Sequence, residues 1–367
     1  MVGLFVSNLF SINSYKGKYD VEVYNSKESI KKRNEVVRCI AKDSFLVIDS
    51  NVSQIYPEIV KAWNSDWVCV LEAIESNKEL SVCEDLIKRL TAVSFKKDMS
   101  IVVIGGGIIQ DISSFTASIL YRGVDWIFLP TTLLAQSDSS IGSKTSINFK
   151  GIKNILGNFF PPRKIYCFTD FLETLGEDEV KSGIGEILHY YIINDSNHSE
   201  LLYLDYEKII AEPGKIYPHI IESLSIKKKM IEIDEFDSGP RRVFNYGHTF
   251  GHAIECLSDF KLSHGQSVTL GMDIANFISL SMGMITEKRY KKLKKVLSKN
   301  IPDYKIDHDH VEDFIKLLKN DKKSTKGKIV YILPAGKKGV SLIETDDEQK
   351  IKKLIYEYIK WEGTIKI

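Results

Sequence analysis

The chain has 367 residues, with 50 Lys and Arg against 49 Asp and Glu and a formal net charge of +1. This length exceeds one ordinary domain and suits two, and its 43% hydrophobic and 27% charged residues are typical of a folded globular protein. The balanced charge gives no overall basic field for nucleic acid or an anionic membrane, and no apolar run reaches the ~18 residues that span a bilayer.

Strands and helices alternate in the first half of the chain. Helical spacing marks residues 83–95 and 113–121. Short apolar runs predict strands at 44–50, 67–71, 101–107, 125–132 and 165–168. Such alternation, with glycines at a strand end, is typical of an α/β domain whose parallel sheet is covered on both faces.

The second half is mostly helical. Long periodic patterns predict helices at 176–193, 217–233, 249–257, 266–284, 311–319 and 347–361. Pro161 and Pro162 precede the last predicted strand of the first half, and paired prolines often mark a break between elements. We therefore expect a first domain of residues 1–167 and a helical second domain of residues 168–367.

The cysteines and the start of the chain bear on its compartment. The five cysteines are scattered, odd in number and without a Cys-x-x-Cys pair, which argues against a disulfide scaffold or a zinc finger. The apolar start lacks the basic segment and the cleavage site of a signal peptide. A cytoplasmic enzyme is expected.

Three glycines, Gly105, Gly106 and Gly107, lie where a predicted strand meets a predicted helix. Glycine lets the backbone approach a pyrophosphate, and a helix N-terminus offers unpaired N–H groups to it. The triplet departs from the Gly-x-Gly-x-x-Gly spacing, so a tight turn without a ligand is the alternative. Asp49 and Glu75 are available as hydrogen-bond acceptors for a ribose and favour a nucleotide site.

Several histidines and one glutamate lie close together in the sequence of the helical half. His248 and His252 are four residues apart on one predicted helix face, and Glu186 and His189 are three apart on another. His264 follows in the segment SHGQ. Imidazoles and carboxylates are the usual ligands of Zn²⁺. Spacing alone makes both His248 and His252 metal ligands. Four histidines outside this cluster are expected to be ordinary surface or core residues, namely His198, His219, His308 and His310.

Several cations lie beside glycines or polar turns, where they suit a substrate with more than one negative charge. The alternative is that they are ordinary surface residues, and spacing does not decide between the two. They are Arg122, Lys144, Lys153, Arg241, Lys322 and Lys323.

Seven segments together resemble the 3-dehydroquinate synthase family, within the wider sugar phosphate cyclases. They are GGGIIQDISSF, LYRGV, LPTTLLAQSDSSIGSKTSIN, KNILGNF, DEFDSGPRRVFNYGHTFGHAIE, LSHGQ and NDKKS. The resemblance runs from about Asp49 to Lys323. It implies a Rossmann-like NAD-binding domain, a mostly α-helical domain that holds Zn²⁺ or Co²⁺, an active site between them and a homodimer.

The resemblance also implies roles for single residues. The metal ligands would be Glu186, His248 and His264, and His252 would contact phosphate instead of the metal. NAD would be held by Asp49, Glu75, Lys78, Gly105, Gly106, Gly107, Asp111, Thr131, Thr132 and Lys153. The substrate would be contacted by Asp138, Lys144, Asn154, Lys227, Arg241, Asn245, Lys322 and Lys323, with Arg122 reaching it from a partner subunit.

The chemistry implied by the resemblance is alcohol oxidation by NAD⁺, β-elimination of phosphate, return of the hydride, ring opening and an aldol closure. His189 replaces the usual lysine beside the metal, and Gln110 and Gln266 replace a usual glycine and glutamate. The segment NFKGIKN also departs from the usual NHPLGKN, toward cyclases of sedoheptulose 7-phosphate. Lys227 and Arg241 follow the family and suit a substrate carboxylate, so we expect a 2-keto-3-deoxy sugar-acid 7-phosphate.

Three alternatives stay open at this point. One is a cyclase of another sugar phosphate, such as sedoheptulose 7-phosphate. Another is a polyol dehydrogenase that pairs NAD with a metal, against which the phosphate-binding and carboxylate-binding cations argue. A third is a non-catalytic relative, suggested by His189, Gln110 and Gln266.

Overall fold

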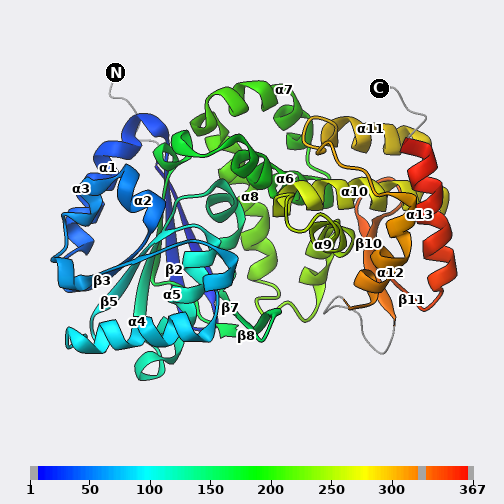
Figure 1. Ribbon diagram of the computed structural model, residues 1–367. Coiled ribbons are helices and arrows are strands. Elements are labelled where there is room, and N and C mark those ends of the chain that lie inside the picture. The colour runs from blue at the N-terminus through cyan, green and yellow to red at the C-terminus, as the bar shows by residue number, and fades with distance from the viewer. Residues whose placement is uncertain (1–6, 321–327, 363–367) are drawn as a thin grey trace, which may run out of the picture. The chain divides into compact units, whose positions relative to one another are not determined.

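A computed structural model describes residues 7–320 and 328–362 (Figure 1). The chain divides into two compact units, Met1–Gly176 with Ala211–Phe236 and Glu177–Ile210 with Asp237–Ile367. This division differs from the predicted one at residue 167. Phe168 and Phe171 belong to the buried core beside the sheet of the first unit, and residues 211–236 return to that unit after an excursion into the second.

The first unit is built on a seven-stranded sheet in the order β1-β2-β9-β6-β5-β3-β4. Neighbouring strands from β2 through β4 in this order are parallel, whereas β1 and β2 form an antiparallel pair at one edge. The bounds are β1 Ser7–Ser14, β2 Gly17–Tyr24, β3 Ser44–Asp49, β4 Val68–Leu71, β5 Ser100–Gly105, β6 Asp125–Pro130 and β9 Lys164–Phe168.

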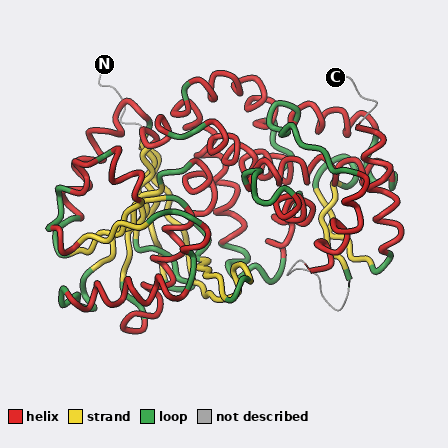
Figure 2. Tube along the Cα trace, viewed as in Figure 1, coloured by secondary structure: helices red, strands yellow, loops and turns green. Residues whose placement is uncertain are grey.

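Helices cover this sheet, as the tube view shows (Figure 2). On one face Leu46, Val102 and Leu129 pack into a core with Val37 and Val52 from two of the helices. The alternate residues of β3, β5 and β6 are buried as well, so both faces are covered and the predicted α/β fold is confirmed. The helices are α1 Ser26–Ile40, α2 Ser50–Ile55, α3 Pro57–Val60, α4 Leu80–Ala92, α5 Gly107–Ile119 and α8 Tyr217–Ile231.

A separate hairpin of β7 (Lys144–Phe149) and β8 (Ile152–Phe159) belongs to the same unit. Its register shifts between Ile147 and Phe149, so the ladder is interrupted at Asn148. Asn148 pairs instead with Glu79, which directly precedes α4. The sequence did not predict this hairpin, which carries Lys144, Lys153 and Asn154.

The second unit is mostly helical, as predicted. Its central element is α10 (His264–Ser281), in which every residue from Gly265 to Ser279 is buried. A helix that is buried around its whole circumference needs neighbours on all sides. Those packed against it are α6 Glu177–Ile193, α9 His248–Leu257, α11 Glu287–Leu297, α13 Glu348–Glu362 and β10 Ile329–Pro334. The unit also contains α7 His198–Ala211, α12 Val311–Asn320 and β11 Val340–Thr345, which pairs with β10 in a hairpin that the sequence did not predict. Over residues 7–320 and 328–362, no helix combines the length and apolar character needed to cross a membrane.

Candidate active site

The residues predicted to hold NAD lie along one edge of the parallel sheet. Asp49 ends β3, Gly105 ends β5, Thr131 follows β6, and Glu75 opens a short 3-10 helix after β4. These four strands are neighbours, so their carboxyl ends bring the four positions together. The carboxyl edge of a parallel sheet is where such folds bind nucleotides.

The turn from β5 to α5 suits a pyrophosphate. Helix α5 begins at Gly107, and Gly106 at its N-cap has no side chain to occupy the first N–H groups. A β-carbon on Gly106 would lie 2.8 Å from Cγ2 of Thr132, so only glycine allows the turn to pack this closely on that residue. Backbone N–H groups and the helix dipole together favour an anion here.

A polar network joins the predicted cofactor residues to the β7–β8 hairpin. Lys78 Nζ lies 2.6 Å from Asp111 Oδ2 and donates to Asn154 Oδ1 at 2.5 Å. The Ser146 N–H donates to the other oxygen of Asp111 at 3.0 Å. Burial raises the pKa of Asp111, while Lys78 and Ser146 act in the opposite direction. Two residues predicted for NAD and one predicted for the substrate are thus held in one network.

Asp138 and Lys227 form a second ion pair in the same unit. Asp138 lies in a π-helical turn, Ala135–Ser139, and Lys227 lies on α8. Lys227 Nζ is 2.7 Å from Asp138 Oδ1 and donates to the Asp138 carbonyl at 2.7 Å. The Ser223 hydroxyl donates to the Ser137 carbonyl at 2.9 Å, so α8 is fixed against this turn. π-Helical turns are frequent at functional sites, and this one positions two residues predicted to contact the substrate.

The remaining predicted cations of this unit lie at its surface or close to it. Lys144 is exposed at the start of β7, and Lys153 is partly buried in β8. Arg122 is exposed after Tyr121 in a turn where both residues have positive φ, 63° and 48°. Lys322 and Lys323 lie outside the described residues.

In the second unit, Glu186, His248 and His264 come together. One ligand atom from each lies within 4.8 Å of the others, and this is the sole such group among the residues described. Glu186 Oε1 is 3.4 Å from His248 Nε2 and 3.2 Å from His264 Nε2. A buried carboxylate between two imidazoles fits the donor set of Zn²⁺ or Co²⁺.

Three helices supply these side chains, and two glycines allow their approach. Glu186 lies on α6, while His248 and His264 are the first residues of α9 and α10. A β-carbon on Gly185 would lie 2.0 Å from the Gly265 carbonyl oxygen, so the backbones of α6 and α10 touch next to both ligand positions. His252 is outside the close group, with its ring centre 5.7 Å from that of His248 and 5.8 Å from that of His264. The contact of His252 with a phosphate stays a prediction.

Glu255 is a residue of this site that the sequence reasoning did not single out. Its Oε2 lies 3.3 Å from His264 Nδ1, on the side of the ring away from Glu186. A carboxylate on the second nitrogen of a histidine ligand fixes its tautomer and orientation. The available signal was the spacing, because Glu255 follows His248 by two helical turns and shares its face of α9.

The pKa values of this cluster lead to a prediction for the metal-free protein. Burial would raise the pKa of Glu186, but His248 and His264 hold it well below its usual range. Burial would lower the pKa of His264, but Glu186 and Glu255 raise it from 6.5 to about 10. The protonated ring therefore stabilises the metal-free fold below pH 6.5, and this stabilisation is lost as the pH rises through 10.

Because a ligating histidine must lose that proton, Zn²⁺ uptake at pH 8 should release a proton from His264, and the apparent affinity should rise by up to about tenfold per pH unit over this window. Calorimetric titration in two buffers of different ionisation enthalpy measures the proton release. Glu255→Gln should reduce it, and equal heats in both buffers for the unmodified protein would contradict the assignment.

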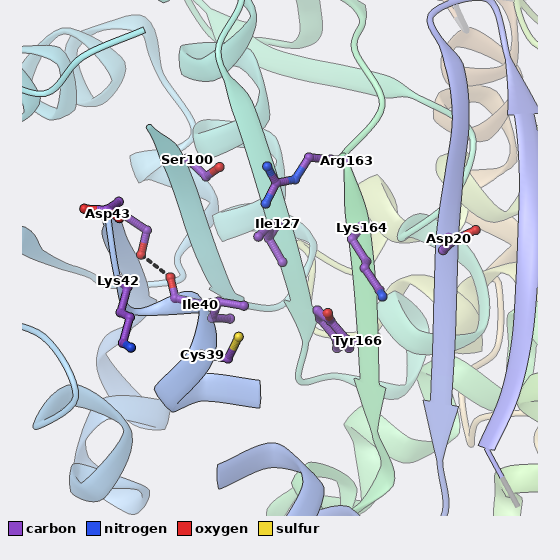
Figure 3. A pocket seen from close by; sticks show the side chains of 11 residues that line it. Asp20, Cys39, Ile40, Lys42, Asp43, Ser100, Ile127, Arg163, Lys164 and Tyr166 are labelled. Carbon is purple, nitrogen blue, oxygen red and sulfur yellow. Dashed lines mark hydrogen bonds between the residues drawn. The ribbon is translucent and has the colours of Figure 1, made fainter. Parts of the chain in front are cut away.

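A pocket of the first unit lies at the amino ends of its strands, opposite the carboxyl ends that carry the residues predicted to hold NAD (Figure 3). Ser44, Ser100 and Lys164, which line it, are the first residues of β3, β5 and β9. Lys164 Nζ is already 2.5 Å from Glu22 Oε1. None of the predicted site residues lines this pocket.

Comparison with known proteins identifies the family. Models of the N-terminal and C-terminal parts of 3-dehydroquinate synthase match residues 68–182 and 183–324. A 3-dehydroquinate synthase of Thermoanaerobacter sp. (strain X514) is 33% identical over 341 residues, which are 90% of this chain and 96% of that protein. The chain belongs to the 3-dehydroquinate synthase family.

Solved structures share the fold. A 2-epi-5-epi-valiolone synthase from Streptomyces hygroscopicus, with NAD⁺ and Zn²⁺ bound, matches 94% of this chain and 97% of its own length with a TM-score of 0.80 and 22% identity. A 2-deoxy-scyllo-inosose synthase complexed with carbaglucose-6-phosphate, NAD⁺ and Co²⁺ matches 95% of this chain and all of its own length, with a TM-score of 0.80 and 24% identity.

His189, the departure from the 3-dehydroquinate synthase pattern beside the metal residues, is enclosed. It is 1% exposed, and its Nδ1 is 3.9 Å from Glu186 Oε2. Its ring centre lies 4.9 Å from that of His248 and 5.9 Å from that of Phe244. Aromatic packing of this kind suits an imidazole where a long ammonium side chain would need another path.

Arg241 and Asn245 also belong to the second unit. Both lie in a 3-10 helix, Pro240–Asn245, which ends three residues before His248. Arg241 is buried, and the Asn245 side chain donates to the Arg242 carbonyl at 2.9 Å. Both therefore lie shortly before the start of α9, and their contact with a substrate stays a prediction.

Gln110, where the 3-dehydroquinate synthase family usually has glycine, ties α5 to the turn that carries Asp138. Gln110 Nε2 donates to the Ser139 carbonyl at 2.7 Å, and the Ser139 hydroxyl donates to Gln110 Oε1 at 2.8 Å. Gln110→Ala should lower the free energy of unfolding by about 1–3 kcal/mol, because it leaves buried polar groups without partners. Urea unfolding measures the loss, and exposed Gln54→Ala is the control. An equal loss of unfolding free energy in both variants would contradict this role.

Gln266, where the family usually has glutamate, accepts a hydrogen bond from the Ser263 hydroxyl at 2.9 Å.

Proposed function

We propose that the protein is an NAD- and metal-dependent cyclase that eliminates phosphate from a 2-keto-3-deoxy sugar-acid 7-phosphate, as 3-dehydroquinate synthases do. The observation that carries the proposal is the close group of Glu186, His248 and His264 in a chain of this family. The carboxyl-edge arrangement of Asp49 and the glycine turn supports NAD as the second cofactor. The NAD⁺ and metal ions in the two cyclase structures agree with it.

Different residues of the chain would bind the metal and NAD. Glu186, His248 and His264 would hold the metal, and the β5–α5 turn with Asp49, Glu75 and Lys78 would hold NAD. When bound, NAD exchanges a hydride with the substrate, and the metal makes a coordinated hydroxyl more acidic.

The cations would bind the anionic ends of the substrate. Arg241 suits a carboxylate because its guanidinium can donate two parallel hydrogen bonds, and Lys227 adds positive charge. Asp138 holds the Lys227 ammonium in one direction. His252 and Lys144 would bind the phosphate, with Lys322 and Lys323 completing its neutralisation and Arg122 reaching it from a partner subunit. Much of the catalysis would come from positioning and fixed charge.

The test is a phosphate-release screen. The metal-loaded protein with NAD⁺ should release inorganic phosphate from the keto-acid phosphate without net accumulation of NADH. Steady NADH production would instead indicate a polyol dehydrogenase, and tight NAD and Zn²⁺ binding without turnover would indicate a non-catalytic relative.

A second candidate substrate is sedoheptulose 7-phosphate, which the segment NFKGIKN favours, and His189 is a further departure from the residue usual in the family. His189→Lys restores the family's usual residue and should raise kcat/KM for the keto-acid phosphate relative to sedoheptulose 7-phosphate by about tenfold, the effect of one charged hydrogen bond. Phosphate release from both substrates measures the ratio. Arg241→Met is the opposing variant, because it should damage only the reaction of the carboxylate-bearing substrate. An unchanged ratio in His189→Lys would remove His189 from the selection of substrate.

We also propose a cytoplasmic homodimer. The five cysteines, which all lie among the described residues, form no disulfide bond, in keeping with a reducing compartment. Light scattering on a sizing column tests the dimer, and mixing Arg122→Ala with a variant inactive in its own metal site tests whether Arg122 acts across subunits.

A further inference from the structure

Asn148 is a buried residue at the point where the predicted cofactor loop meets the β7–β8 hairpin. It is 7% exposed and lies at the interruption of the hairpin ladder. None of the roles proposed above belongs to it. Its hydrogen bonds nevertheless reach Glu75, Lys78 and Asn154, which are the residues assigned to NAD and to the substrate.

Both polar atoms of the Asn148 side chain form hydrogen bonds. Its Nδ2 donates to Glu75 Oε1 at 2.8 Å. Its Oδ1 accepts from the Asn154 N–H at 2.8 Å. Asn154 has a φ of 53°, which is a strained conformation for a residue with a side chain and needs support from its surroundings.

The backbone of Asn148 makes a third link. Because the β7–β8 register shifts here, the Asn148 N–H is turned out of the ladder and donates to the Lys78 carbonyl at 2.8 Å. Lys78 in turn donates to Asn154 Oδ1 at 2.5 Å, which closes a ring of contacts through Asn148, Lys78 and Asn154. A bulge that redirects one residue beside a site is a common device in antiparallel pairs.

The asparagine side chain meets both demands because its amide carries the donor and the acceptor on two separate atoms. It offers a donor to the Glu75 carboxylate and an acceptor to the Asn154 N–H at once. Aspartate keeps the acceptor but has no donor, and it would place a second carboxylate beside Glu75. Alanine has neither group. Glutamine is one methylene longer in a buried position.

We propose that Asn148 is a positioning residue that holds Glu75 and Lys78 in register with Asn154, so that the dinucleotide loop and the substrate-binding hairpin are ordered together. The inference rests on the proposed function for what those residues bind. Its structural half, the fixation of Asn154 by the Asn148 side chain, is independent of any ligand.

Two substitutions test the ligand-binding half and the structural half of the proposal separately. Asn148→Ala should weaken NAD⁺ binding about tenfold to a hundredfold, as expected for loss of a hydrogen bond to a charged group, and should speed hydrogen exchange at the Asn154 amide in the protein without NAD. Asn148→Asp should weaken NAD⁺ binding at least as much while it keeps the Asn154 amide protected, because the acceptor remains. A residue with only a packing role would not divide the two measurements in this way.

Asn158→Ala is the matched control on the same hairpin. Asn158 donates to the Ser118 hydroxyl at 2.9 Å and accepts from the Thr145 hydroxyl at 3.0 Å, and among the described residues its hydrogen bonds do not reach Glu75 or Lys78. It should leave NAD⁺ affinity and exchange at Asn154 unchanged. Calorimetry with NAD⁺ and exchange mass spectrometry on the full-length protein give both readouts.

The outcomes are distinct. If the unmodified protein binds no NAD⁺, the proposed function fails. If it binds NAD⁺ and Asn148→Ala binds equally well, the positioning role of Asn148 is overturned and the proposed function stands. If Asn148→Ala does not fold, the decision falls to Asn148→Asp, in which equal loss of NAD⁺ affinity and of Asn154 protection would reject the proposed division.

Discussion

Glu186→Gln is expected to abolish phosphate release and to weaken Zn²⁺ binding by more than 100-fold. Removal of a residue that only supports a metal ligand costs about 10–100-fold in affinity, and a ligand should cost more. The Glu186 oxygen lies within 3.4 Å of a nitrogen of each partner histidine, so its charge holds the group together. The amide keeps the shape but loses the charge, and leaves His248 and His264 as the remaining strong donors. Competition with a chelating dye measures the affinity.

Two further glutamates make this test specific. Glu177→Gln changes the same helix at an exposed residue that pairs with Lys181, and it should bind Zn²⁺ as the unmodified protein does. The Zn²⁺ affinity of Glu255→Gln should lie between those of Glu177→Gln and Glu186→Gln, because Glu255 orients His264 without entering the close group. Wild-type affinity in Glu186→Gln, or the order of the Glu186 and Glu255 variants reversed, would reject the assignment of the ligand.

The predicted and observed folds agree where the hydrophobic pattern is strong. The strands predicted at 44–50 and 101–107 correspond to β3 and β5, which are buried throughout, because a parallel sheet covered on both faces requires continuous apolar sequence. The edge pair β1–β2 was missed although Tyr19, Val21 and Val23 of β2 alternate with polar residues, a pattern typical of a strand with one exposed face. The excursion of residues 177–210 into the second unit could not be predicted, since both units contain helices of similar pattern.

The metal-ligand group could likewise be predicted only in part from the spacing of its residues. Spacing on one helix predicted His248 and His252 together, yet the close group takes only His248 from α9. Its other members come from α6 and α10, and their approach depends on a contact between two glycines far apart in the sequence. The family resemblance, which reflects the folded arrangement, placed His264 and Glu186 in the group where periodicity could not.

Gly185→Ala is expected to damage the metal site although it changes no ligand. A β-carbon at residue 185 would lie 2.0 Å from the Gly265 carbonyl oxygen, which belongs to the backbone and has no rotamer by which to move aside. Helices α6 and α10 must therefore separate, and the 3.2 Å approach of Glu186 Oε1 to His264 Nε2 must lengthen. Overpacking of this kind costs about 1–3 kcal/mol or more of stability. Zn²⁺ affinity should fall by at least the 10–100-fold seen when support for a ligand is lost.

Ser182→Ala separates this steric effect from simple weakening of the α6–α10 contact. The Ser182 hydroxyl accepts from the Gly265 N–H at 3.1 Å, so its removal costs about 1 kcal/mol of hydrogen bonding without adding an atom between the helices. Ser182→Ala should therefore lower the melting temperature slightly and keep the visible spectrum of bound Co²⁺, whereas Gly185→Ala should lower both the melting temperature and Co²⁺ binding. A Gly185→Ala protein with an unchanged Co²⁺ spectrum would mean that the helices can separate while the ligands stay in place, and that the glycine contact is a feature of packing alone.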